Sequence, residues 1–154
     1  MQPMPPQFEF LMHLAADVGE VQTLGGGPLG ERRVVAITGG RFEGPRLKGE
    51  IVPGGADWQI VRADGVLDID ARYVMRTEQG ALIRVVSQGY RHGPPEVLAA
   101  LGRGEDVPRD RYFFRTVMRF ETGAADLLWL NRCIALASAE RKARQVRLES
   151  WRLL

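Results

Sequence analysis

The sequence contains few of the residues that metal and redox sites require. It has one cysteine, Cys133, and two histidines, His13 and His92, among 154 residues. A single cysteine excludes an internal disulfide and any multi-cysteine metal site. The histidines are far apart and form no spacing typical of metal ligands, and the carboxylates form no calcium-loop pattern. We therefore expect no bound metal and no cofactor.

Long apolar runs are also missing. No stretch approaches the ~18 apolar residues of a membrane-spanning helix, so no membrane association is expected. The first ten residues, MQPMPPQFEF, lack the basic segment and apolar segment of a secretory signal. These features predict a cytoplasmic protein.

Charge and loop chemistry exclude several further classes. Lys and Arg number 21 against 19 Asp and Glu, and basic residues concentrate only over residues 140–152, so no nucleic-acid partner is expected. The glycines at 25–27 and 39–40 lack the Lys-Ser/Thr ending of a phosphate-binding loop. Ser87 and Ser138 lie in no nucleophile-elbow motif. Hydrolase, nucleoside triphosphatase and dehydrogenase activities have no motif to support them.

What is present is a regular alternation of apolar and polar residues. The length and the 45% hydrophobic fraction fit one globular domain over residues 1–154, with residues 1–6 as a loose N-terminal arm. Period-two alternation with turn signals every 8–12 residues or so predicts an antiparallel β-meander. Strands are expected at 7–16, 32–44, 47–52, 57–62, 66–77, 81–91, 112–121, 132–138 and 145–153.

Helix signals are sparse. Residues 94–103 begin with proline and end at glycine, as a short helix does, and residues 126–131 suffice for one or two turns. Residues 17–30 hold five glycines and are expected to form a long flexible connection, and Pro53-Gly54-Gly55 is expected to turn the chain. We predict an all-β fold, a single antiparallel β-barrel of about 8–10 strands with one short helix, because closure removes exposed sheet edges.

Several segments resemble an uncharacterised family, catalogued as domain of unknown function 3237. The resemblance runs from about Arg33 to the last strand, and it rests on GGRFEGPRLKGEIVPGGADW, LDIDARYVMRTEQGALI, GYRHGPPEV, YFFRTVMRFETG and WLN. It implies an antiparallel barrel of calycin-like or allene-oxide-cyclase-like shape, related to small ligand-binding barrels. It also implies a link to cyclisation or isomerisation, with which a few fungal relatives are associated. It implies no established catalytic residues.

Charged residues on the expected strands are the candidates for a functional site. Alternation puts Asp70 and Arg72 on one face of their strand, and Arg115 and Glu121 on one face of another. If these faces line the barrel, the four are the candidate catalytic groups, and the candidate ligand-binding residues are Asp57, Trp58, Tyr73, Arg91, Trp129 and Asn131. Two alternatives remain: the polar faces lie in solvent, or they form a buried ion-pair network that only fixes the barrel.

Three functions are compatible with these features. The first is an isomerase, cyclase or lyase that uses carboxylate and arginine chemistry on a hydrophobic or aromatic metabolite, without metal or nucleotide cofactor. The second is a non-catalytic carrier or sensor of a small hydrophobic molecule. The third is an interaction protein, for which Trp151, Leu153 and Leu154 indicate a homodimer. Whether the protein is an enzyme is left open.

Overall fold

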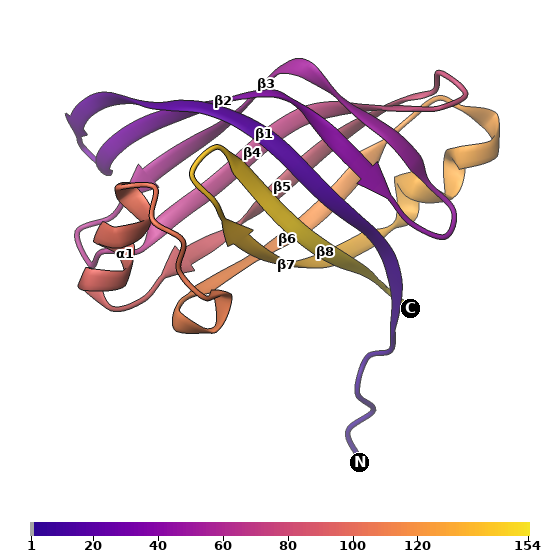
Figure 1. The fold of residues 1–154 in the computed structure, drawn as a ribbon. Coiled ribbons are helices and arrows are strands. Elements are labelled where there is room, and N and C mark those ends of the chain that lie inside the picture. The colour runs from indigo at the N-terminus through magenta and orange to yellow at the C-terminus, as the bar shows by residue number, and fades with distance from the viewer. Residues whose placement is uncertain (1) are drawn as a thin grey trace.

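The computed structural model describes residues 2–154 and forms a closed barrel of eight antiparallel strands (Figure 1). Each strand pairs with the next along the chain, and β8 pairs with β1 to close the barrel. The strands are β1 (Phe8–Gly27), β2 (Gly30–Glu43), β3 (Lys48–Val61), β4 (Leu67–Thr77), β5 (Leu82–His92), β6 (Phe113–Glu121), β7 (Ile134–Arg141) and β8 (Gln145–Leu153). The predicted all-β barrel is confirmed.

Three short helical segments connect the strands. The helix α1 (Pro95–Gly102) follows β5 and lies at one end of the barrel, as the sequence predicted. The 3-10 turn η1 (Arg109–Arg111) precedes β6. The 3-10 segment η2 (Ala125–Arg132) lies at the opposite end of the barrel from α1 (Figure 1).

Two connections differ from the prediction. Residues 17–30 are not a flexible loop: β1 and β2 extend as a paired ribbon to Gly27 and Gly30, which projects beyond the barrel body. Pro53-Gly54-Gly55 does not end a strand, because β3 continues through it with register shifts against both neighbours. Proline tolerates such a position because a bulge leaves one backbone N–H without a ladder partner.

Gly40 shows why a glycine pair interrupts β2. Its φ of +133° lies in a region that residues with a Cβ atom avoid, and an added Cβ would lie 2.1 Å from the carbonyl oxygen of Ala15. The β1–β2 register shifts beside this point, between Asp17 and Val18. Glycine therefore allows the two strands to approach closely where the wall bends.

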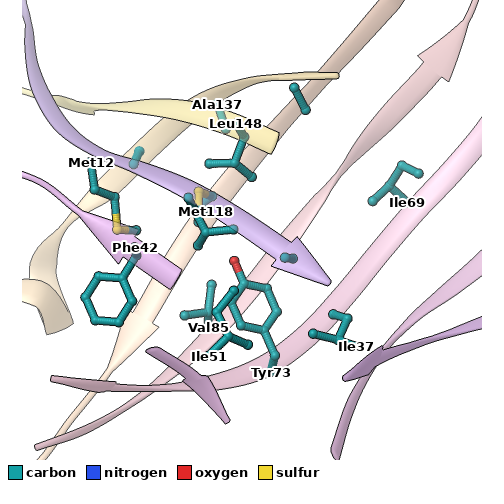
Figure 2. Packing of buried hydrophobic residues seen from close by; sticks show 14 of the residues in the cluster. Met12, Ile37, Phe42, Ile51, Ile69, Tyr73, Val85, Met118, Ala137 and Leu148 are labelled. Carbon is teal, nitrogen blue, oxygen red and sulfur yellow. The ribbon is translucent and has the colours of Figure 1, made fainter. Parts of the chain in front are cut away.

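The barrel interior is filled at the η2 end. The largest fully buried side chains include Phe42, Met12, Ile51, Met75 and Leu130, and Figure 2 shows several of them meeting across the barrel. On β4 every second residue from Leu67 to Thr77 is buried, except Ala71, which is partly exposed, and the residues between them are exposed or partly exposed. These apolar side chains fill the barrel interior at that end, whereas a cavity opens into the interior at the end beside α1.

Over the residues that the structure describes, no helix is long and apolar enough to cross a membrane.

Candidate functional site

A cavity of about 560 Å³ opens at the end of the barrel beside α1. Its apolar wall includes Val35 and Val61 from the strands and Leu98 and Leu101 from α1. The helix positions these two leucines over the opening because they lie three residues apart, on one side of α1. The volume is within the range of small-molecule sites, which is about 300–1,000 Å³.

A second, smaller space of about 50 Å³ lies deeper in the lumen. It shares Val18, Val35 and Arg141 with the outer cavity, so the two spaces are neighbours along the barrel axis. Polar groups line it as well: Asp57 and Tyr73, and the buried pair Ser87 and Thr116, whose hydroxyls are hydrogen bonded at 2.8 Å. The inner space is therefore narrow and mostly apolar with a few polar groups, and it lies beneath a wider opening lined by both apolar and charged residues.

Asp57 is fixed in the lumen by a chain of hydrogen bonds. The Gln59 side-chain amide donates to one carboxylate oxygen of Asp57 at 2.7 Å, and the backbone N–H of Asp70 donates to the other at 3.0 Å. Arg33 in turn donates to the Gln59 carbonyl oxygen at 2.9 Å. Both oxygens of Asp57 thus have a fixed direction, and the rotamer of Gln59 is set by an arginine.

Burial raises the pKa of Asp57 above its ordinary value of 3.8. The hydrogen bonds from Gln59 and Asp70 and the charge of Arg91 act in the opposite direction but do not cancel the loss of hydration. A carboxyl group with a raised pKa keeps its proton to a higher pH than an ordinary aspartate does, and a group that can donate and accept a proton is what general acid–base catalysis requires.

Three arginines face the same lumen. Arg33, Arg91 and Arg141 all line the outer cavity. Burial and the repulsion of Arg141 and Arg33 lower the pKa of Arg91 to about 10, and burial also lowers the pKa of Arg141. Among the described residues, none of the three has a carboxylate within 4.0 Å. The lumen consequently carries an excess of positive charge.

The four candidate catalytic residues lie outside the barrel. Asp70 and Arg72 form an ion pair on the outer face of β4, with Nε and Oδ1 3.1 Å apart. Arg115 and Glu121 lie on the exposed face of β6. Of the orientations left open by the sequence, β4 and β6 have the polar face in solvent, so these side chains do not line the lumen. Asp70 contributes to the site only through its backbone N–H.

The polar faces of β4 and β6 lie in solvent because the chain contains little helix. An apolar outer face would need other elements to cover it, and α1 has only eight residues. Turning the apolar faces of β4 and β6 inward buries their hydrocarbon surface and leaves the charges hydrated, which avoids the large cost of burying ions.

The candidate ligand-binding residues divide between the lumen and the exterior. Asp57, Tyr73 and Arg91 point inward, and Tyr73 is 6% exposed with its hydroxyl directed into the barrel (Figure 2). Trp58 is 47% exposed on the outer face of β3.

The two candidates from the WLN motif are also outside the lumen. Trp129 lies in η2, at the end away from the cavity, with the Arg46 guanidinium 3.9 Å from its ring centroid. Asn131 makes two hydrogen bonds with the backbone of Thr122, at 2.8 and 2.9 Å, and so attaches η2 to the end of β6. Neither side chain lines the cavity beside α1.

Arg33, Gln59 and Arg141 were not predicted as site residues. A signal for the arginines is present in the sequence: on β2, β5 and β7, an inward apolar face has an arginine at one end. Arg33 precedes Val35 and Ile37, Arg91 follows Ile83 and Val85, and Arg141 follows Ala137 and Ala139. Antiparallel pairing brings these three strand ends to the same mouth.

Taken together, the fold and its cavity define a closed antiparallel β-barrel whose lumen opens at one end, with several arginines around the opening and a largely apolar interior beneath it. The chain belongs to the family described as "Protein of unknown function (DUF3237)", whose model matches residues 6–153. It is similar to a UPF0311 protein of Bradyrhizobium diazoefficiens, at 40% identity over 138 residues that cover 90% of each chain. The resemblance predicted from the sequence is confirmed.

Solved structures agree with the fold. A beta-barrel like protein of Acinetobacter baumannii has 43% sequence identity and a TM-score of 0.85, over 99% of each chain. A more distant relative has a named activity: it is a hydroalkoxylation enzyme of Penicillium herquei, 31% identical over 84 residues, which cover 54% of this chain and 56% of that protein.

Proposed function

We propose that the protein is an enzyme that cyclises or isomerises a largely hydrophobic, unsaturated metabolite inside the barrel, and that Asp57 transfers the proton. The observation that carries this proposal is the position of Asp57: its carboxyl group lines the inner cavity, is held at both oxygens, and has a raised pKa. The distant relative named as a hydroalkoxylation enzyme supports a reaction of this class.

The reaction is an intramolecular addition of a hydroxyl group to a carbon–carbon double bond. The protonated carboxyl of Asp57 donates its proton to one alkene carbon, while the substrate oxygen forms a bond with the other. The π bond breaks, and the proton of the hydroxyl group returns to Asp57. The product has the same atoms as the substrate, so the reaction consumes neither an oxidant nor a reductant.

The arginines support the same step. A guanidinium group that donates a hydrogen bond to a substrate oxygen holds the substrate in place beside Asp57, and it does so more strongly where water is excluded. Arg91, whose Nε is buried without a hydrogen-bond partner in the described part of the chain, has donors available for that oxygen. Val61, Leu98 and Leu101 supply the apolar wall for the body of the substrate.

The experiment is a substitution of Asp57 by asparagine, tested on a panel of 2-allylphenols and 2-prenylphenols. Ring closure leaves the mass unchanged and alters the chromatographic retention, so liquid chromatography with mass detection measures it. We expect Asp57→Asn to lower the rate by about 100-fold or more, the usual contribution of a general acid or base.

The matched control is Asp70→Asn, which removes a carboxylate from the outer face of the neighbouring strand and keeps the backbone N–H that Asp57 accepts. It should retain the wild-type rate. If Asp57→Asn is as active as the wild type, Asp57 has no role in proton transfer.

A non-catalytic carrier is the second candidate, and the excess of arginine in the lumen favours it. Groups that hold an anionic ligand do not by themselves change it. Under this alternative the wild-type protein binds members of the panel and releases them unaltered.

A further inference from the structure

Three arginines, Arg33, Arg91 and Arg141, and the Asp57 carboxylate line the lumen, and the outer cavity is also lined by Arg103, Arg144 and a second carboxylate, Glu20. The Asp57 carboxylate is already engaged. Asp57 accepts hydrogen bonds from Gln59 and from the Asp70 backbone, so it does not neutralise an arginine at contact distance. Even with Asp57 ionised, the site has more positive than negative charge. Buried charges without a partner are costly, and a bound anion removes that cost.

The arginines also have free donor groups. Within the described residues, the Nε atoms of Arg33 and Arg91 are buried and have no hydrogen-bond partner. Arg33 uses its Nη2 for Gln59. Arg141 has only a 3.4 Å side-chain contact with the Ala143 carbonyl oxygen. Guanidinium groups bind carboxylates and similar oxyanions through paired N–H donors, and these donors are available here.

The surrounding wall is apolar on the strands and on α1. Val18, Val35, Leu67, Leu98 and Leu101 line the cavity, and Tyr73 with Ile69 lines the deeper space. A ligand that complements both the arginines and the apolar wall has one acidic group and an apolar body. A small inorganic anion would leave the apolar wall unused, whereas a neutral apolar ligand would leave the arginines unpaired.

We propose that the lumen selects amphiphilic anions, namely aromatic or unsaturated molecules with a single carboxylate or ionised phenolic group, which binds at Arg33, Arg91 and Arg141. This inference deepens the proposed function, because it names the substrate class of the same site, and it also applies to a carrier. The apolar body of the ligand extends towards α1 and leaves the acidic group beside Asp57.

Two fluorescent probes that differ by one acidic group test this selection. 8-Anilinonaphthalene-1-sulfonate is an aromatic anion, and N-phenyl-1-naphthylamine is the same ring system without the sulfonate. Each is titrated into the wild-type protein at pH 7, and the dissociation constant is obtained from the fluorescence increase. We expect the anion to bind at least about tenfold more tightly, as a charge-assisted hydrogen bond predicts.

Substitutions then locate the acidic group. Arg91→Gln and Arg141→Gln should each weaken binding of the sulfonate probe about tenfold and change binding of the neutral probe less than about twofold. Circular dichroism shows whether each variant is folded. Arg115→Gln is the matched control, because Arg115 lies on the exposed face of β6 beside an outer apolar surface. It should leave both affinities unchanged.

Four results would overturn the proposal. Equal affinities for the two probes in the wild type would mean that the cavity has no preference for anions. Equal losses for both probes in the lumen variants would assign the arginines a purely structural role. Loss of sulfonate binding in Arg115→Gln would place the probe outside the barrel. Failure of the wild type to bind either probe would mean that the lumen does not accept aromatic anions of this size.

The same titration separates this inference from the proposed function. Asp57→Asn should keep or tighten sulfonate binding, because it removes a negative charge from the lumen. If binding is selective but no phenol is cyclised, the anion site stands and the catalytic proposal fails. If neutral substrates are converted and the probes bind equally, the catalytic proposal stands and the anion site fails.

Discussion

At the scale of single residues, the site depends on how burial in the lumen shifts the pKa values of its charged groups. Asp57 keeps its hydrogen bonds to Gln59 and to the Asp70 backbone, yet burial dominates and raises its pKa. Burial has the opposite effect on an arginine: together with the repulsion of the other arginines, it lowers the pKa of Arg91. Such a site is energetically costly when empty, and the anionic ligand proposed above would reduce that cost.

The raised pKa of Asp57 predicts a specific dependence of stability on pH. Between pH 3.8 and the raised pKa, the folded state binds more protons than the unfolded state, so this residue's contribution to the free energy of unfolding falls as pH rises. Asp57→Asn removes that dependence. Urea unfolding from pH 4 to pH 7 should show the wild type losing stability relative to Asp57→Asn as pH increases. A difference that is constant or has the opposite slope would contradict a raised pKa.

At the scale of elements, the two ends of the barrel are packed differently. The segment η2 seals the filled end: Leu130 is fully buried, and Asn131 attaches the segment to β6 through the Thr122 backbone. The helix α1 lies at the other end and leaves a cavity beneath its leucines. One end is thus packed core, and the other holds the cavity of the proposed ligand site.

This division predicts the effect of two leucine substitutions in η2. Leu130→Ala should lower the free energy of unfolding by about 2–5 kcal/mol, because it leaves a cavity in packed core. Leu128→Ala, in the same segment, should change it by less than about 0.5 kcal/mol, since that side chain is 47% exposed. Urea denaturation measures both. Affinity for the naphthalene probes should be unchanged in each, and a large loss of binding in Leu130→Ala would mean that the two ends are coupled.

At the scale of the whole molecule, the barrel is closed by the pairing of β1 with β8. Nine residue pairs join these strands, from Phe8 with Leu153 to Asp17 with Gln145. The backbone N–H of Leu154 also donates to the carbonyl oxygen of Gln7 at 2.9 Å, and the two ends of the chain leave the barrel on the same side (Figure 1). The fold therefore does not depend on where the chain is interrupted, provided that every strand is intact.

A circular permutant tests that conclusion. Residues 7 and 154 are joined by a linker of about four Gly and Ser residues, and new termini are placed in the exposed turn at Gln79. Because the turn lies at the opposite end from the cavity, the permutant should fold and bind the sulfonate probe as the wild type does. Circular dichroism and the probe titration measure this.

The control permutant opens the chain between Arg72 and Tyr73, within β4, and should not fold. Equal behaviour of the two permutants would mean that strand continuity is not what maintains the barrel.

Much of the fold was predictable because local patterns carry it. Alternation marked the strands, glycines marked the bends, and the proline-to-glycine segment at 94–103 marked α1. Pro53 was misread as a turn because a bulge within a long strand uses the same residue types as a turn. The paired ribbon at 17–30 was not predicted from the sequence, because its five glycines indicate a loop. The pairing of β1 with β2 becomes visible only in the structure.

The sequence by itself determined the two faces of each strand, since side chains alternate with a period of two. It could not determine which face is inside, because alternation separates the two faces of a strand without showing which one is buried. Tertiary structure decided that, by burying the apolar faces of β4 and β6 in a barrel with too little helix to cover them. It also decided the site: Arg33, Arg91, Arg141 and Asp57 are distant in sequence, and only barrel closure brings those strand ends around one lumen.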